Sequence, residues 1–437
     1  MESKLVKKNC LSISYFSLKK TIFLLIMFIY GFFSTPTPDR MGIPEIIMLV
    51  LLIIMFGNNA EKLIKDTISS VINFRKIIIF LFAFYFVFFC SFWGLTINQN
   101  TPSNFIRDFI PFIYLCIPIL MHYDIKRKPN DWLSTLIIGM IIAGIGFIWQ
   151  FYIDPSVKLQ KILTFHQIYG SNRDYPWQDS VSIFAFSFFA GMSTYYLFKK
   201  RFINFFIFLL FYVFFLLVYA VTISRAPIVL SFVTMLIVLW FVIPYKSRNK
   251  WQKRLSIIIL IILFSFPIMH LLFPVVSNIF KLVIEKTQRV GITNARITEI
   301  KAVINNITCL SKLFLGEGWG GLISNPIGGG AKWRFVHNMI FYFLFKTGFL
   351  GILLIVIYIG WILRPIKNIK FFLKKLDTSY AISFIALFPP LIVSGALEPS
   401  FKSLSFGVLL STFLAFYYNY IAHQNIIRVW RLKKKDN

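Results

Sequence analysis

Charged residues are scarce in this chain of 437 residues: they make up 14% of it, and only 17 residues are acidic. A soluble chain of this length would have about a quarter of its residues charged, so soluble globular and disordered classes are excluded. The four cysteines are dispersed and indicate no disulfide framework. Histidine, cysteine and carboxylate side chains form no cluster with metal-ligand spacing, so we predict neither a metal nor a cofactor. An internal repeat is also lacking, which disfavours a transporter built from two related halves.

Apolar residues dominate instead: they make up 57% of the chain, which includes 52 phenylalanines. Apolar runs of about 15 to 25 residues recur along the sequence, the length that a helix needs to cross a bilayer. The fold class predicted is therefore an all-α polytopic membrane protein with about twelve transmembrane helices. The predicted spans are 22–34, 43–57, 77–97, 105–121, 132–152, 181–198, 202–221, 226–243, 255–273, 338–363, 380–397 and 404–422.

The basic residues indicate how the chain is oriented. The formal charge is +29, and alternate loops hold 30 of the 46 lysines and arginines. Lysine and arginine next to a span are retained in the cytoplasm, so we expect a multi-pass protein of the bacterial inner membrane with both termini cytoplasmic. This sorting accounts for the positive charge without a nucleic acid partner. We interpret the first apolar run as a retained span, because its polar lead is long and no signal-peptide cleavage site follows.

The predicted loops divide the chain into five parts. A cytoplasmic N-terminal segment, 1–20, precedes nine spans in 21–273, and three more spans lie in 338–422 before a basic cytoplasmic tail, 423–437. The remaining part, 274–337, is one large periplasmic loop, much longer than most of the other outer loops. Any chemistry is therefore expected on the outward face.

An amphipathic helix is predicted at 294–307 within this loop, because apolar residues recur there with helical spacing. Arg296 falls inside the apolar stripe and within the first helical turn, where the helix dipole disfavours a cation. An anion such as phosphate would compensate. The alternative is an arginine that snorkels at the helix end.

A second arginine, Arg225, lies in a short outer turn between two spans. Ser224 is a good N-cap residue and Pro227 suits a first helical turn, so the next helix should begin here. Arg225 then lies at the membrane boundary, either as an interfacial anchor or as a ligand for a diphosphate, since guanidinium groups bind oxyanions through paired hydrogen bonds.

The third candidate, His337, begins the tenth span. Helical spacing places Gly348 and Ile355 beneath it on one stripe, and Gly348 and Gly351 should let a neighbouring helix approach closely. A lone histidine here could also be an ordinary interfacial residue. Lys346 lies on the opposite side of the helix and about 13 Å deeper, where an ionisable residue is a functional candidate unless it snorkels.

Two weaker signals remain in the outer regions. The glycine-rich stretch 316–321, which contains Glu317, could turn amide groups toward a phosphate, but glycine-rich outer loops are common. Asp108 and Glu398 could line a cavity, or could simply be local ion-pair or boundary residues.

Several short motifs occur in a characteristic order: Ser224-Arg225-Ala226, Ala295-Arg296-Ile297 leading to Gly316-x-Gly318-x-Gly320, and His337-Asn338 followed after nine residues by Gly348-x-x-Gly351. In this order, and with one large outer loop before the tenth of twelve spans, the chain resembles the O-antigen polymerase and ligase superfamily of bacterial envelope glycosyltransferases. It departs from that pattern at Lys346, where an acidic or polar residue is more usual.

The resemblance implies a GT-C-like helical fold and a metal-independent enzyme. Such an enzyme would transfer saccharide from a polyprenyl-diphosphate carrier on the periplasmic side of the membrane. In a polymerase the acceptor is another lipid-linked repeat unit, whereas in a ligase it is the lipid A core. Its partners would be the lipid-linked oligosaccharide, the lipid bilayer and, for a polymerase, a chain-length regulator. The third hypothesis is a transporter of lipid-linked saccharide.

The resemblance also suggests roles for individual residues. Arg225 and Arg296 would hold the diphosphate, which in a site without a metal must be neutralised by protein cations. His337 would take the proton of the acceptor hydroxyl or orient that hydroxyl, with Glu317, Glu398 and Asp108 as rival bases. The further residues predicted to bind substrate are Asn338, Ser224, Lys346, Glu317 and Arg334.

Overall fold

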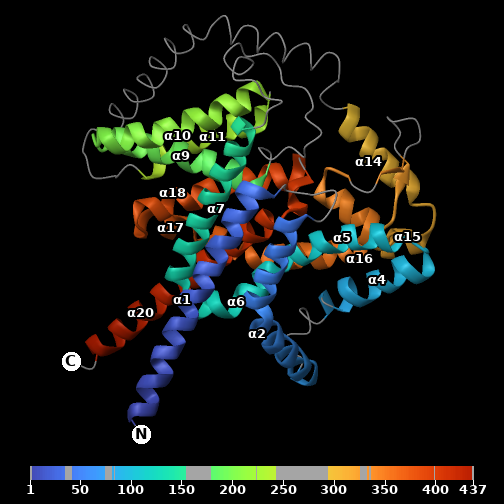
Figure 1. The fold of residues 1–437 in the computed structure, drawn as a ribbon, viewed down its shortest axis with the longest axis horizontal. Helices are drawn as coiled ribbons and strands as arrows, with labels where there is room; N and C mark the ends of the chain where they lie inside the picture. Colours follow the sequence, from blue (N-terminus) through green and yellow to red (C-terminus); the bar gives the residue numbers. More distant parts are fainter. Residues whose placement is uncertain are drawn as a thin grey trace, which may run out of the picture.

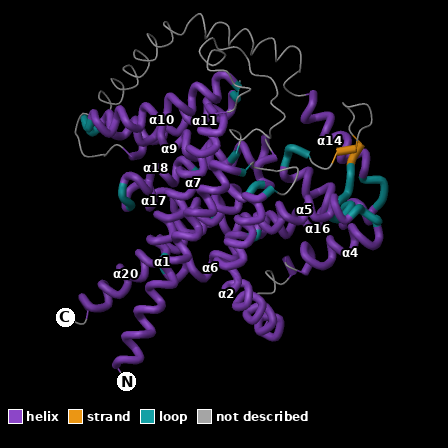
Figure 2. Tube along the Cα trace, viewed as in Figure 1, coloured by secondary structure: helices purple, strands orange, loops and turns teal. Residues whose placement is uncertain are grey.

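A computed structural model describes most of the chain (Figure 1). The described residues are 2–34, 42–73, 81–82, 84–153, 179–222, 224–242, 294–324, 332–333, 336–397 and 399–435. They are helical apart from connecting loops and one pair of two-residue antiparallel strands, β1 (Ile323–Ser324) and β2 (Lys332–Trp333) (Figure 2).

The described helices have the following order along the chain. In the first half they are α1 (Glu2–Phe33), α2 (Ile43–Asn73), η1 (Phe84–Phe89), α4 (Cys90–Phe92), η2 (Trp93–Ile97), α5 (Pro102–Leu115), α6 (Ile117–Arg127), α7 (Pro129–Ile153), α9 (Ser180–Phe198) and α10 (Phe202–Val221). In the second half they are α11 (Arg225–Ile237), η4 (Val238–Val242), α14 (Asn294–Asn306), α15 (Leu310–Leu315), α16 (Met339–Ile362), η5 (Arg364–Asn368), α17 (Ile369–Lys375), α18 (Thr378–Ala386), α19 (Phe388–Ile392), η6 (Val393–Leu397), η7 (Pro399–Lys402) and α20 (Leu404–Lys435).

Eight described segments are long and apolar enough to cross a membrane, which confirms a helical polytopic membrane protein. They are Ile43–Leu63, Pro102–Arg127, Pro129–Ile153, Ser180–Phe198, Phe202–Tyr219, Met339–Leu373, Thr378–Gly395 and Leu404–Ile426, and each overlaps a predicted span over most of its length. Two shorter apolar helices, Phe84–Ile97 and Ala226–Trp240, match two more predicted spans, and α1 contains residues 22–33 of another. The predicted span 255–273 lies outside the described residues, so the total of twelve stays a prediction.

Helix α9 lies at the centre of one half of the molecule. Every residue from Ser180 to Thr194 is buried, because α7, α10, α11, α18 and α19 pack around it. Figure 1 shows α9, α10 and α11 side by side above α17 and α18. A helix that is apolar on most sides is either buried in protein or faces the lipid of a membrane, and residues 180–194 of α9 are buried in protein.

Helix α10 has one buried and one exposed face. Phe215 is buried against α9, and its neighbour in that interface, Phe186 of α9, lies 6.2 Å from it between ring centroids. On the other face Phe206, Leu210 and Phe214 are 62%, 59% and 44% exposed. They are spaced four residues apart and so form one apolar stripe, which a polar solvent would not favour.

Aromatic rings from segments far apart in the sequence make up the core of the other half. Phe86 of η1 stacks on Phe112 of α5 with 5.0 Å between centroids, and the Trp319 ring lies 5.6 Å from that of Phe112. Phe343 of α16 meets Phe86 edge-on. This cluster fixes α5, α16 and the loop that follows α15 relative to one another, and α20 joins it to the half around α9.

Helix α16 is kinked, unlike the continuous helix that the sequence pattern assumes. Gly348 has φ 64° and ψ −168°, which are not helical angles. The prediction that Ile355 continues the stripe beneath His337 is therefore wrong, because helical spacing does not carry across the kink. The predicted close approach is confirmed at Gly348, where an added Cβ would lie 2.3 Å from the carbonyl carbon of Phe314 in α15.

Candidate functional site

His337 is held immediately before the first turn of α16. The side chain of Asn338 occupies the N-cap position, and its Oδ1 accepts hydrogen bonds from the backbone N–H groups of Ile340 (3.0 Å) and Phe341 (3.3 Å). An asparagine in this position satisfies donors that the helix itself leaves unpaired. The backbone beside His337 is thus fixed by a strong local signal, and Asn338 has a structural role whether or not it contacts substrate.

A carboxylate that the sequence did not single out contacts His337. The Oε1 atom of Glu299 in α14 lies 2.8 Å from the His337 ring nitrogen Nδ1, and the backbone N–H of His337 donates to Oε2 over 3.3 Å. The Glu299 side chain is 5% exposed, whereas that of His337 is 24% exposed. The imidazole is therefore anchored on its inner side and remains partly accessible.

The helix that carries Glu299 is the predicted amphipathic helix, observed at Asn294–Asn306. It packs against α16 and β1, and its Val303 is fully buried. Arg296 lies three residues before Glu299, and residues with this spacing are neighbours on a helix surface. The fold thus brings the turn that carries Arg296 close to His337. The side chain of Arg296 lies outside the described part, and so do Arg334 and Glu398, so their roles stay predictions.

Ser224 and Arg225 begin α11, as predicted, but the predicted side-chain cap is wrong. The Ser224 hydroxyl lies 3.1 Å from the hydroxyl of Thr222 and caps no helical N–H. Ser224 itself is 8% exposed. Helix α11 packs against α9, α10, α18 and α19, whereas α14 packs against α16 and β1. The side chain of Arg225 lies outside the described part, so a hollow shared with Arg296 and His337 stays a prediction.

Lys346 is enclosed by protein. It is fully buried and forms an ion pair with Asp108 of α5, and its ammonium also donates to the backbone carbonyl of Gly321 over 2.6 Å. Asp108 accepts two more hydrogen bonds, from the N–H of Gly320 (2.8 Å) and from the hydroxyl of Tyr342 (3.3 Å). Lys346 therefore does not snorkel, and the network gives Lys346 and Asp108 a shared structural role.

The glycine-rich stretch adopts the unusual backbone angles that were expected, with φ of 70°, 72° and 89° at Gly316, Gly318 and Gly320. Its amide groups do not face outward. The N–H of Glu317 donates to the carbonyl of Phe345 over 2.9 Å, and that of Gly318 donates to the carbonyl of Lys346 over 2.8 Å. The prediction that these amides bind a phosphate is therefore wrong for Glu317 and Gly318, because their N–H groups already donate to backbone carbonyls of α16.

The carboxylate of Glu317 is bound by side chains of nearby residues in the sequence. Its Oε1 accepts from the side chain of Asn306 over 2.9 Å and pairs with the ammonium of Lys312 at 2.7 Å. The Glu317 side chain is 15% exposed. These contacts tie the end of α14 to the loop after α15, and they give Glu317 less access to an acceptor hydroxyl than His337 has.

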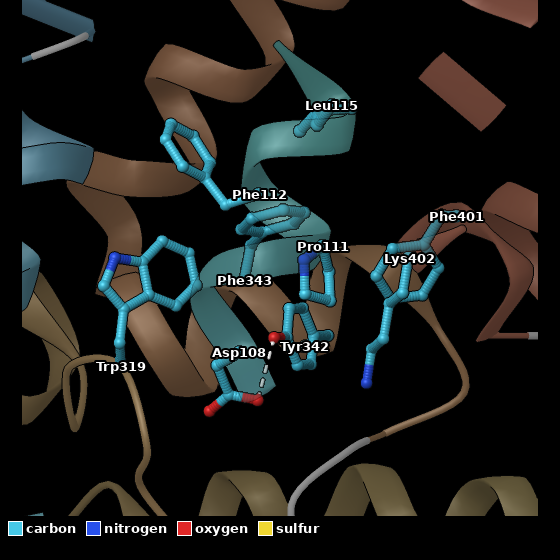
Figure 3. Close-up of a pocket in the computed structure, with 9 residues that line it drawn as sticks. All are labelled: Asp108, Pro111, Phe112, Leu115, Trp319, Tyr342, Phe343, Phe401 and Lys402. Carbon is cyan, nitrogen blue, oxygen red and sulfur yellow. Dashed lines mark hydrogen bonds between the residues drawn. The ribbon is translucent and has the colours of Figure 1, made fainter. Parts of the chain in front are cut away.

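A small cavity lies between α5, α16 and η7 (Figure 3). In Figure 3 the Tyr342 ring stands between Asp108 and Lys402, and both charged groups point to the same side. The ammonium of Lys402 lies 4.0 Å from the centroid of the Tyr342 ring. The cavity has a volume of about 10 Å³, which is space for about one water. It is thus too small for a saccharide.

No protein-family model matches the chain, and no curated protein is significantly similar to it.

Proposed function

We propose that the protein is a metal-independent glycosyltransferase of the bacterial inner membrane that polymerises a surface polysaccharide such as O-antigen. It would transfer saccharide from a polyprenyl-diphosphate carrier to a lipid-linked acceptor on the periplasmic side. The observation that carries this proposal is the docking of α14 on the start of α16, which places a partly exposed, anchored His337 beside the helix turn that bears Arg296.

The residue types suit the reaction. The diphosphate that leaves carries negative charge, and guanidinium groups placed where it develops would stabilise it. Arg296 is the nearer candidate by helix position, and Arg225 is the second. An imidazole can accept a proton near neutral pH, so His337 would take the proton of the acceptor hydroxyl.

The apolar surface of the helices suits a lipid-linked substrate. Phe206, Leu210 and Phe214 of α10 form an exposed apolar stripe, and most spans expose similar residues. Such surfaces are stable in hydrocarbon. A polyprenyl chain could therefore reach the protein from within the bilayer while its diphosphate stays at the polar boundary.

Complementation of a gene deletion tests the proposal. We expect the wild-type gene to restore a ladder of long lipopolysaccharide on a gel, and Arg296→Ala or His337→Gln to leave core capped with a single repeat. Loss of a diphosphate ligand or of a general base typically slows a reaction about 10²- to 10⁴-fold. Lys301→Ala is the matched control, because it removes an exposed lysine from the same helix and should leave the ladder unchanged.

The pattern of products separates the alternatives. Uncapped core with accumulated lipid-linked polymer would identify a ligase instead. Substrate trapped on the cytoplasmic leaflet would identify a transporter. A full ladder in both the Arg296→Ala and the His337→Gln strains, with each variant present at the wild-type level, would refute the site.

A further inference from the structure

Glu299 contacts both the ring and the backbone of His337. Its Oε1 and Oε2 atoms lie 2.8 Å and 3.1 Å from the ring nitrogen Nδ1, and Oε2 also accepts the backbone N–H of the same residue over 3.3 Å. A single contact would let the imidazole turn about its side-chain bonds. A carboxylate that holds both the backbone and the ring defines the ring's orientation as well as its position.

Burial makes this contact more than a surface ion pair. The Glu299 side chain is 5% exposed, and α14 is held in place by its packing on α16 and β1. The acid is therefore fixed by the fold rather than by the histidine. The His337 side chain is 24% exposed, so part of it remains accessible.

A carboxylate can only accept hydrogen bonds. When Glu299 is ionised, Nδ1 of His337 must carry the proton, and the lone pair of the neutral ring lies on Nε2. We infer that Glu299 is a positioning residue that holds His337 in the Nδ1–H tautomer, so that Nε2 receives the proton of the acceptor hydroxyl. This role rests on the function proposed above.

In the proposed step the acceptor O–H bond breaks and its proton moves to Nε2 of His337, while the oxygen uses its electron pair to form a bond to the anomeric carbon of the donor. The bond between that carbon and the phosphate oxygen breaks, and the electron pair leaves with the polyprenyl diphosphate. The resulting imidazolium has its Nδ1–H directed at the Glu299 carboxylate, which stabilises the new charge, in the way that a buried carboxylate supports a catalytic histidine elsewhere.

A purely structural role for Glu299 predicts a different outcome, since a carboxamide of the same size could still join α14 to α16. Glu299→Gln removes the acceptor-only character without changing the shape. The first measurement is therefore the tautomer of the resting protein, read from ¹⁵N chemical shifts of selectively labelled histidine. The chain has five histidines, and the His337 signals are those absent from the His337→Gln variant.

We expect the Nδ1–H tautomer in the wild type and a mixture of tautomers in Glu299→Gln. The second measurement is transfer by purified protein with a lipid-linked donor and acceptor. Glu299→Gln should lower kcat about 10²- to 10⁴-fold and change KM less than about threefold, and Glu299→Asp should restore part of the loss. Glu45→Gln is the control. The Glu45 carboxylate also accepts two hydrogen bonds, from the hydroxyl of Ser34 (2.6 Å) and from the backbone N–H of Gly42 (2.8 Å), and neither donor is a histidine.

The outcomes separate this inference from the proposed function. An Nε2–H tautomer in the wild type, or a tautomer unchanged by Glu299→Gln, would overturn the inference whatever the protein transfers. Wild-type transfer by Glu299→Gln, in a preparation where His337→Gln is inactive, would overturn it as well. Wild-type transfer by His337→Gln would instead overturn the proposed site.

Discussion

Two buried carboxylates, Asp108 and Glu299, each pair with a basic residue in or next to α16, and the two pairs differ in how exposed the basic partner is. Asp108 and Lys346 have side chains that are 5% and 0% exposed, and the network around them is completed by Gly320, Gly321 and Tyr342. Glu299 is equally buried, but His337 is 24% exposed. A charge pair that protein encloses on all sides can support the fold, whereas a pair with one accessible member can also act on a ligand.

Breaking the enclosed pair should have the largest effect. Lys346→Met would leave Asp108 buried without its cation, a change that typically costs about 3–5 kcal/mol. We expect a strongly reduced yield of monodisperse protein in size-exclusion chromatography and a lower melting temperature in detergent. Lys65→Ala is the control, because Lys65 and Glu61 pair at the surface with side chains 72% and 63% exposed, and such pairs contribute little. Equal melting temperatures for the two variants would contradict the structural role of Lys346.

Disturbing the loop that surrounds the enclosed pair should have the next largest effect. Gly318 has φ 72°, and a Cβ there would lie 2.4 Å from the Cα of Gly94. Gly318→Ala should therefore cost about 1–2 kcal/mol for the left-handed conformation and about 1–3 kcal/mol more for displaced backbone. The melting temperature of the purified variant measures this loss.

Gly360 provides the matched control for this substitution. It lies in α16, and an added Cβ would meet nothing within 4 Å. Gly360→Ala should keep or slightly raise the melting temperature, because alanine is the better helix former. A Gly318→Ala protein as stable as Gly360→Ala would show that the loop is not packed as tightly as described.

Labelling Cys309 should leave the stability of the protein unchanged. It would show which side of the membrane carries the partly exposed pair of Glu299 and His337. Cys309 is exposed and lies just before α15. The hydroxyl of Ser311 and then the backbone N–H of Lys312 lower the pKa of its thiol, so it should react readily near neutral pH. We expect a membrane-impermeant maleimide to label it in spheroplasts, and Cys309→Ser to abolish that label. Labelling that requires permeabilised membranes would place the loop in the cytoplasm.

Much of the fold could be predicted from the sequence, because span length and apolar content are local properties. Eight predicted spans recur as long apolar helices, and the amphipathic helix at 294–307 is observed within one residue of its predicted end. The close approach at Gly348 was also predictable, since it depends on residue type, whereas the capping role of Asn338 emerges only in the structure. The kink at Gly348 was not predictable, because its angles are set by contact with Phe314 of α15.

The candidate site was predicted only in part. His337 and Arg296 stood out as polar residues that a membrane protein does not place at random. Glu299 did not, because a glutamate on the surface of an amphipathic helix is ordinary until a neighbour buries it. Likewise the amides of 316–321 looked available for a phosphate, and only the packing of that loop against α16 shows that they are already bonded.

The sequence by itself determined the solvent of this protein and the positions of its helices, because hydrophobic thickness and helical spacing act over about 20 neighbouring residues. The tertiary structure alone decided which charges meet. Lys346 contacts Asp108, which is 238 residues away in the sequence, and His337 contacts Glu299, which is 38 residues away. Electrostatic partners are chosen by proximity in space, and here proximity depends on how α5, α14 and the loop after α15 pack on α16.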